Sequence, residues 1–499
     1  MARTVKDTLL DLGRPEYLKS PEMALSALVW SLVGDNNSMG IGPGKGLVYH
    51  ERVPSGSSRL DIKKVLPADS SFYESLYTEW DRRGLDTSSV PIGNNEVVKS
   101  LLYAIVGTQP TKSKSFSCLP INPAASLLQD LRGIQAKTGP ANFAKIIQQI
   151  YQLGCADTGK NETAASIWYK QLASEPDQGI FKFLSDALKF VGPHREGEIA
   201  IPEVKTVFCD KDFIPTEWLL NIPNPFVWFY SSWNIFCKEE WTKSLPRRKW
   251  VDWASGIIRT SLGMCYLWEA DFYKKLGTQL IGNYDNSPSD AASYVLSSND
   301  PLINWIGPEF PISIRDNNSK IIRLIITGSG VRDVLGNWMR TLGGNSFKRN
   351  YKSINGLSNW IEDARSLITR EQQRDIEWHY NTTKLTSAMK NTKELINYSL
   401  TSRGEYGTNA DFYNLLTRKS NRFLVVDPGG EWVVLMSSLA AKLPGHPTTL
   451  AILKDSFSQL GIHFNRKQLV KVLEKSGLSK SSHDADEALE IKPSYYLYD

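Results

Sequence analysis

The chain has few of the residues and patterns that identify metalloproteins, secreted proteins and membrane proteins. Its 499 residues include only five cysteines, without a C-x-x-C pair, and six scattered histidines. We therefore expect neither a zinc site nor a disulfide framework, and a reducing compartment suits the protein. No apolar run reaches the roughly 18 residues that a membrane-spanning helix needs. The charged start of the chain lacks the apolar core of a secretory signal, so the sequence predicts a cytoplasmic protein.

Two glycine-rich segments do not match the known nucleotide-binding motifs. Residues 40–46 read GIGPGKG, but a Walker A loop needs four residues between its first two glycines and a Ser or Thr where Gly46 stands. Gly328-Ser329-Gly330 follows a strand-like run, yet Asp333 occupies the place of the third Rossmann glycine. The sequence therefore predicts no nucleotide cofactor, and no other cofactor is expected.

One set of residues allows a catalytic interpretation. Glu203 and Lys205 form an E-x-K pattern in a strand-like run over residues 199–209, and Asp186 lies upstream. PD-(D/E)XK nucleases use such residues, with two carboxylates that bind Mg²⁺ and a lysine that orients the attacking water. Asp186, however, falls in a helical stretch, and E-x-K is a short pattern. A metal-dependent nuclease is therefore an alternative hypothesis, and ordinary charges on an exposed strand edge are the other interpretation.

Tryptophan is the residue that the chain has in abundance. Seven of its 15 tryptophans lie between Trp218 and Trp268. After Pro246 a long helix is expected, in which Trp250, Trp253 and Trp268 recur on one face. Aromatic stripes at helical spacing are usually core, so we expect these rings to be buried together. The other interpretation is a surface on which bases stack.

The periodicity of apolar residues predicts a mainly α fold with minor β structure (α+β) in a multi-domain protein. Asn122 and Pro123 have the pattern of a helix start. Residues 311–327 are expected to form a β-hairpin around Asp316-Asn317-Asn318. The expected domains are a helical region with long loops (1–120), a helical domain with a tryptophan-rich core (121–280), an α+β region with the hairpin (281–420) and a separate C-terminal domain (421–499).

The C-terminal segment carries the basic charge of the chain. Residues 417–480 contain ten Lys/Arg against four Asp/Glu, while the whole chain has a net charge of +5. The expected elements are a strand (423–426), helices over residues 432–443, 448–460 and 466–475, and a strand near residues 488–491. In the third helix Lys467, Lys471 and Lys475 follow one another at four-residue spacing, opposite Leu469 and Leu473.

Three short helices followed by a loop and a strand resemble a winged-helix domain. The resemblance implies that residues 466–475 are the recognition helix and that residues 479–486 are the wing. It implies a nucleic-acid-binding set of Arg466, Lys467, Lys471, Lys475 and Lys480. The acidic residues Asp484, Asp486 and Glu487 depart from the pattern, because they would repel phosphates. Winged helices also bind proteins, so both partners stay open.

Residues 247–273 and 477–493 together resemble accessory subunits of bacterial anti-phage defence operons. That resemblance implies protein partners such as an ATPase or a nuclease subunit. The first hypothesis is therefore a non-enzymatic cytoplasmic subunit that binds DNA, a protein partner or both. The alternatives are the nuclease that uses Asp186, Glu203 and Lys205, and a structural protein–protein adaptor.

Overall fold

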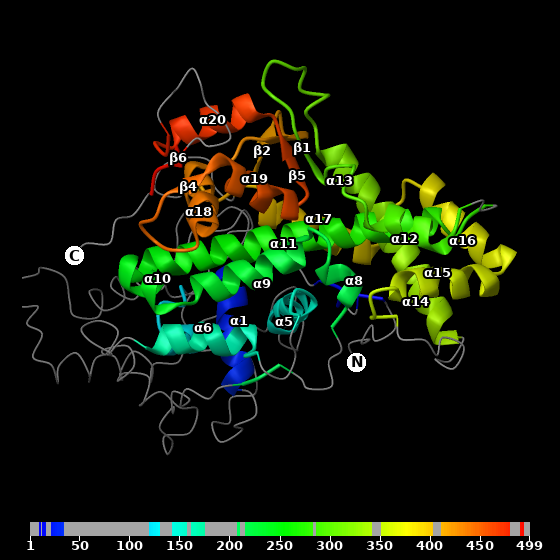
Figure 1. Cartoon of the computed structure of the whole chain (residues 1–499), viewed down its shortest axis with the longest axis horizontal. Coiled ribbons are helices and arrows are strands. Elements are labelled where there is room, and N and C mark those ends of the chain that lie inside the picture. Colours follow the sequence, from blue (N-terminus) through cyan, green and yellow to red (C-terminus); the bar gives the residue numbers. More distant parts are fainter. Residues whose placement is uncertain are drawn as a thin grey trace, which may run out of the picture.

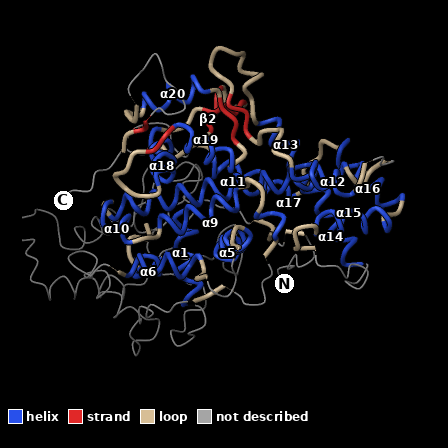
Figure 2. The backbone as a smooth tube through the Cα atoms, in the orientation of Figure 1, coloured by secondary structure: helices blue, strands red, loops and turns tan. Residues whose placement is uncertain are grey.

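Helices build most of the computed structural model of the chain, and a few short strands gather at one edge (Figures 1 and 2). The structure describes residues 9–10, 12–15, 21–33, 119–129, 142–156, 161–174, 207–209, 215–282, 286–341, 351–402, 411–479 and 490–493. The expected fold class, mainly α with minor β, is confirmed.

One long helix, α11 (Arg247–Thr278), forms the axis of the fold (Figure 1). It starts directly after Pro246, as the sequence predicts. A helix that is buried on all sides needs partners on all sides, and α11 buries nearly all residues from Trp250 to Gly277. Its cover includes α1 (Pro21–Val33), α9 (Pro225–Phe236), α17 (Ser387–Leu400) and the π-helix η4 (Ile325–Ser329).

Short helices precede α11 and pack against it or against its neighbours. Asn122 caps the first of them through its side-chain oxygen, which accepts a hydrogen bond from the Ala125 backbone N–H at 2.7 Å. The expected helix start at Asn122-Pro123 is therefore confirmed. These helices are α4 (Pro123–Leu128), α5 (Phe143–Leu153), α6 (Ala164–Ala173), α8 (Glu217–Leu220) and α10 (Glu239–Ser244).

The prediction of a β-hairpin over residues 311–327 is wrong, because this segment forms α13 (Asn318–Leu324) and then η4. The Asp316-Asn317-Asn318 turn is present, but it starts a helix: Asp316 Oδ1 accepts from the Asn318 N–H at 2.9 Å. Ile321, Leu324 and Ile325 are buried at helical spacing. Packing against α11 thus outweighs the strand preference of the isoleucines.

Four further helices complete the part of the fold that lies beside the C-terminal half of α11 (Figure 1). Gly330 begins one of them, α14, directly after η4, so the segment Gly328-Ser329-Gly330 lies within helix and follows no strand. These helices are α12 (Pro288–Leu296), α14 (Gly330–Thr341), α15 (Gly356–Leu367) and α16 (Arg370–Asn381).

The strands form three two-stranded sheets among the described residues. β1 (Ile303–Trp305) pairs in parallel with β5 (Ile462–Phe464), so the centre of the chain is joined to its C-terminal part. β2 (Leu416–Lys419) and β3 (Phe423–Val426) form an antiparallel hairpin. Its turn residues Ser420 and Asn421 have φ of 49° and 54°, as a tight hairpin turn requires. β4 (Thr448–Thr449) pairs with β6 (Glu490–Ile491).

The C-terminal helices are α18 (Gly430–Ala441), α19 (Leu450–Gln459) and α20 (Arg466–Lys475). Their order and positions agree with the sequence-based expectation. Two long-range hydrogen bonds join them to the central helices. Trp432 Nε1 donates to Thr260 Oγ1 of α11 at 3.0 Å, and Trp228 Nε1 of α9 donates to Ser456 Oγ at 3.1 Å.

The tryptophans of α11 lie in the core. Trp250 and Trp253 are completely buried, whereas Trp268 is partly buried against Phe272, with ring centroids 5.4 Å apart. Trp168 stacks on Trp250 at 4.2 Å with an interplanar angle of 8°. The core interpretation is confirmed, and Trp250 and Trp253 are not available for stacking with bases.

We expect Trp250→Ala to lower the free energy of unfolding by about 3–5 kcal/mol, because the deletion leaves a cavity beside Trp168. Urea unfolding monitored by circular dichroism measures the loss. The matched control is Trp378→Ala on α16, where the side chain is 50% exposed and the loss should be much smaller. Equal losses in the two variants would contradict the assignment of Trp250 to the core.

Candidate nucleic-acid interface and buried polar clusters

The sequence-predicted site residues fall into two groups. Asp186, Glu203, Lys205 and Lys480 lie outside the described residues. The nuclease hypothesis therefore stays a prediction, since the positions of Asp186, Glu203 and Lys205 relative to one another are not described. Arg466, Lys467, Lys471 and Lys475 lie on α20, all exposed.

α20 is held in place by one apolar face. Asn465 caps the helix with its side-chain oxygen, which accepts from the Lys467 N–H at 2.9 Å. Leu469 and Leu473 are completely buried, and the helix packs against α18. The opposite face is therefore fixed toward solvent, at the outer edge of the molecule (Figure 1).

The exposed face carries Lys467, Lys471 and Lys475, which we call the lysine ridge. Each four-residue step advances about 6 Å along the helix and about 40° around it, so the ridge spans about 12 Å. Within the described part of the chain, no ridge lysine has an acidic partner. Arg466 lies a quarter turn away, and Glu474 flanks the ridge, so the helix has a net charge of +3 (four cations, one anion).

A loop that sequence reasoning missed lies beside α20. Residues 307–314 join β1 to α13 and project at the same edge of the molecule (Figure 1). Gln468 Nε2 of α20 donates to Glu309 Oε1 of this loop at 3.2 Å. The two residues are 159 positions apart. Neither has a local sequence signal, so only the paired strands β1 and β5 bring them together.

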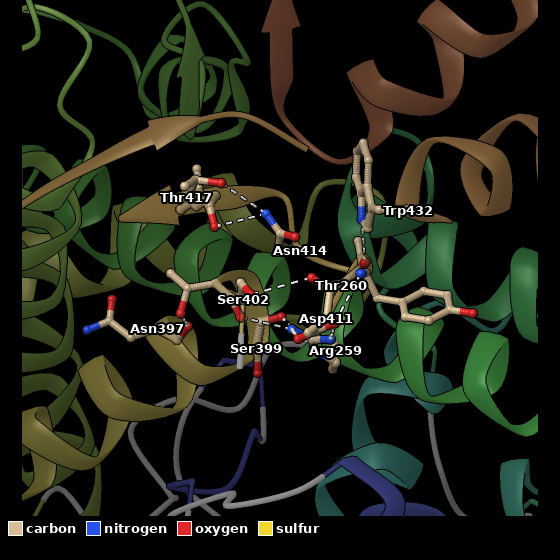
Figure 3. A network of polar contacts seen from close by, with 12 residues as sticks. Arg259, Thr260, Asn397, Ser399, Ser402, Asp411, Asn414, Thr417 and Trp432 are labelled. Carbon is tan, nitrogen blue, oxygen red and sulfur yellow. Dashed lines mark hydrogen bonds and ion pairs between the residues drawn. The ribbon is translucent and has the colours of Figure 1, made fainter. Parts of the chain in front are cut away.

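A buried cluster around Arg259 binds α11 to two other segments (Figure 3). The Arg259 side chain is 1% exposed and forms an ion pair with Asp411 at 3.0 Å. Its Nε and Nη2 also donate to the backbone oxygens of Ser399 and Thr401, at 3.1 and 2.9 Å. Because every nitrogen of the guanidinium has a partner and the side chain is closed to water, we interpret the cluster as a structural clamp.

A second buried cluster lies between α11, η4, α14 and α16. Arg332 Nη1 donates to Glu269 Oε2 at 3.0 Å, and both side chains are buried. Burial raises the pKa of the Glu269 carboxyl, and Arg332 opposes that shift. His379 packs so closely on Gly330 that a Cβ there would collide with the imidazole. The π-helix η4 ends directly before Gly330, and π-helical turns often accompany functional sites. These contacts alone indicate no ligand.

The described cysteines lie in the core. Cys155, Cys209, Cys237 and Cys265 are buried free thiols. Burial raises the pKa of Cys209 to about 11 and raises that of Cys237 and Cys265 as well. Since the thiolate is the reactive form, Cys209, Cys237 and Cys265 fit the core rather than catalysis.

Comparison with known proteins adds no assignment: no family model and no curated protein matches the chain. Among the described residues, His, Cys, Asp and Glu side chains form no group of three that could bind a metal ion. None of the described helices has both the length and the apolar character needed to cross a membrane.

Stability should fall as the pH drops below about 6.5, in part through His379. Burial lowers the pKa of this imidazole, and the nearby Asp333 and Asp375 oppose the shift. The unfolded chain therefore takes up the proton first, and the folded state loses stability until the pH passes below the folded pKa. Urea unfolding between pH 7 and pH 5 should show a weaker pH dependence for His379→Asn. An unchanged dependence would show that His379 does not contribute.

Asp411→Asn should lower the free energy of unfolding by about 3–5 kcal/mol, because Arg259 would keep its charge in the core without a counterion. Chemical denaturation measures the loss. Glu239→Gln, which breaks the exposed Lys243–Glu239 pair, is the control and should change stability little. If Asp411→Asn behaved like the control, the clamp role of Arg259 would be refuted.

Proposed function

We propose that the chain is a non-enzymatic DNA-binding subunit of a multi-protein assembly, and that α20 binds the phosphate backbone of duplex DNA. The observation that carries the proposal is the lysine ridge, which is exposed along one line of a helix whose other face is fixed in the core. The order α18, α19, α20 and β6, with β6 paired to β4, supports it, because this order resembles a winged helix. In helix-turn-helix proteins the corresponding helix lies in the major groove.

Spacing and charge favour a phosphate backbone as the ligand. Phosphates on one strand of DNA succeed one another every 3.4 Å along the axis, so a ridge of about 12 Å covers about three steps. Lysines at this spacing can follow one strand and release its counterions. The cations of the β2–β3 hairpin are a poorer candidate, because Lys419 pairs with Asp427 at 3.3 Å and Arg422 lies over the Phe423 ring.

The protein partners belong to the same proposal. An ATPase or nuclease subunit in a cytoplasmic anti-phage assembly is supported by the sequence resemblance of residues 247–273 and 477–493. A subunit without its own reaction would deliver such a partner to DNA. Docking of α20 onto a protein instead of DNA is the competing outcome of the experiment below.

Charge reversal at Lys471 and Lys475 should weaken duplex binding without unfolding the protein, because both side chains are exposed. Fluorescence anisotropy with a short labelled duplex of mixed sequence, over a series of salt concentrations, measures the affinity of the full chain. The slope of log affinity against log salt should fall by about 0.9 for each phosphate contact that is lost.

The matched control is charge reversal at Lys384 and Lys390, two exposed lysines before and on α17. It changes the net charge equally but should leave the affinity and the slope near those of the parent protein. An α20 variant that binds DNA as tightly as the control refutes DNA binding by α20. Protein docking would then be the better interpretation of the ridge.

A further inference from the structure

The loop of residues 307–314 has a defined conformation beside α20. The Phe310 N–H donates to the Gly307 carbonyl at 3.2 Å, and the Ile314 N–H donates to the Pro311 carbonyl at 3.0 Å. Two successive turns therefore shape the loop, and Pro308 and Pro311 restrict its backbone further. Asn317 fixes the end of the segment, because its N–H donates to the Leu424 carbonyl at 2.7 Å.

The same loop is bound directly to α20. Besides the hydrogen bond from Gln468 to Glu309, the Gly307 backbone lies against the Gln468 side chain. A Cβ at Gly307 would collide with Gln468 Nε2, so a side chain there would displace the ends of Gln468 and Glu309 from their present positions. The hydrogen bond also directs the Glu309 carboxylate toward α20, where the side-chain amide of Gln468 donates to it. The loop and the helix that carries the lysine ridge thus lie at one edge of the molecule and are in contact.

Two large apolar side chains of the loop are exposed. Phe310 is 47% exposed and Ile314 is 54% exposed. Single exposed apolar residues are common on protein surfaces. Here, however, two of them lie in one eight-residue loop that is hydrogen-bonded to a helix with unpaired lysines. A surface that combines cations with apolar residues fits a ligand with an anionic edge and an apolar interior.

We infer that the 307–314 loop enters a groove of duplex DNA beside the strand that α20 follows, with Phe310 and Ile314 against sugars and base edges. This inference rests on the proposed function of α20. Charge complementarity favours DNA, because the lysine ridge can neutralise the phosphates that flank a groove while the loop contacts the sugars and the thymine methyl groups inside it. Proteins that bind in the minor groove insert phenylalanine, isoleucine and proline between base steps, and apolar groups contact the thymine methyl in the major groove.

The test uses the full chain with Phe310→Ser and Ile314→Ser combined, and the same labelled duplex over the same salt series. Both side chains are exposed, so the melting temperature should not change. The affinity should fall roughly tenfold, which corresponds to about 1.4 kcal/mol, if the two side chains are among the few that carry most of the binding energy of an interface. The salt slope should stay that of the parent protein, because apolar contacts release no counterions.

A matched apolar control is Leu367→Ser combined with Trp378→Ser, two exposed side chains on α15 and α16. It should leave DNA affinity unchanged. If the loop variant also binds like the parent while the Lys471 and Lys475 variant loses affinity, the groove contact is overturned and the role of α20 stands. If the loop variant lowers the salt slope as the lysine variant does, the loop only positions α20, and the inference is again overturned. A lysine variant with full affinity would refute the proposed function itself.

Discussion

The burial of α11 on all its faces is the constraint on which the rest of the structure depends. A helix with one apolar stripe needs one partner, but α11 buries residues on every side and is stable only when it is enclosed. The enclosing helices come from segments as far apart as α1 and α17. The buried apolar side chains accordingly form one continuous cluster, to which the C-terminal helices contribute through Trp432 and Phe457.

Buried charges add directional requirements to this apolar packing. Apolar contacts allow neighbouring helices to slide, whereas Arg259 has its best hydrogen bonds in one register only. Its partners lie at the end of α17 and at Asp411, so one side chain sets the positions of two segments relative to α11. Arg332 and Glu269 act in the same way between α14 and α11. The polar groups therefore favour the arrangement of the helices in which each guanidinium meets its carboxylate.

Features encoded over a few residues could be predicted from the sequence. Asn122 followed by Pro123 starts a helix, Pro246 precedes α11, and Leu469 with Leu473 identifies the buried face of α20. The isoleucines of residues 321–326 led to the wrong prediction of a strand. β-branched residues favour strands, but here burial against another helix outweighs that preference. Contacts between distant residues had no signal at all. Gln468 and Glu309 meet only because β1 pairs with β5, so the 307–314 loop could not be placed beside the predicted helix.

The pairing of β1 with β5 affects the order in which the protein is assembled during translation. Ile303 precedes its partner Ile462 by 159 residues. At a synthesis rate of 5–20 residues per second, roughly 8 to 30 s pass between the synthesis of β1 and the synthesis of β5. An unpaired strand edge can recruit other chains in that interval, but a strand of three residues offers them little backbone to bind. The helix that carries the lysines follows β5 directly, so it reaches its final position only after most of the core beneath it has been synthesised.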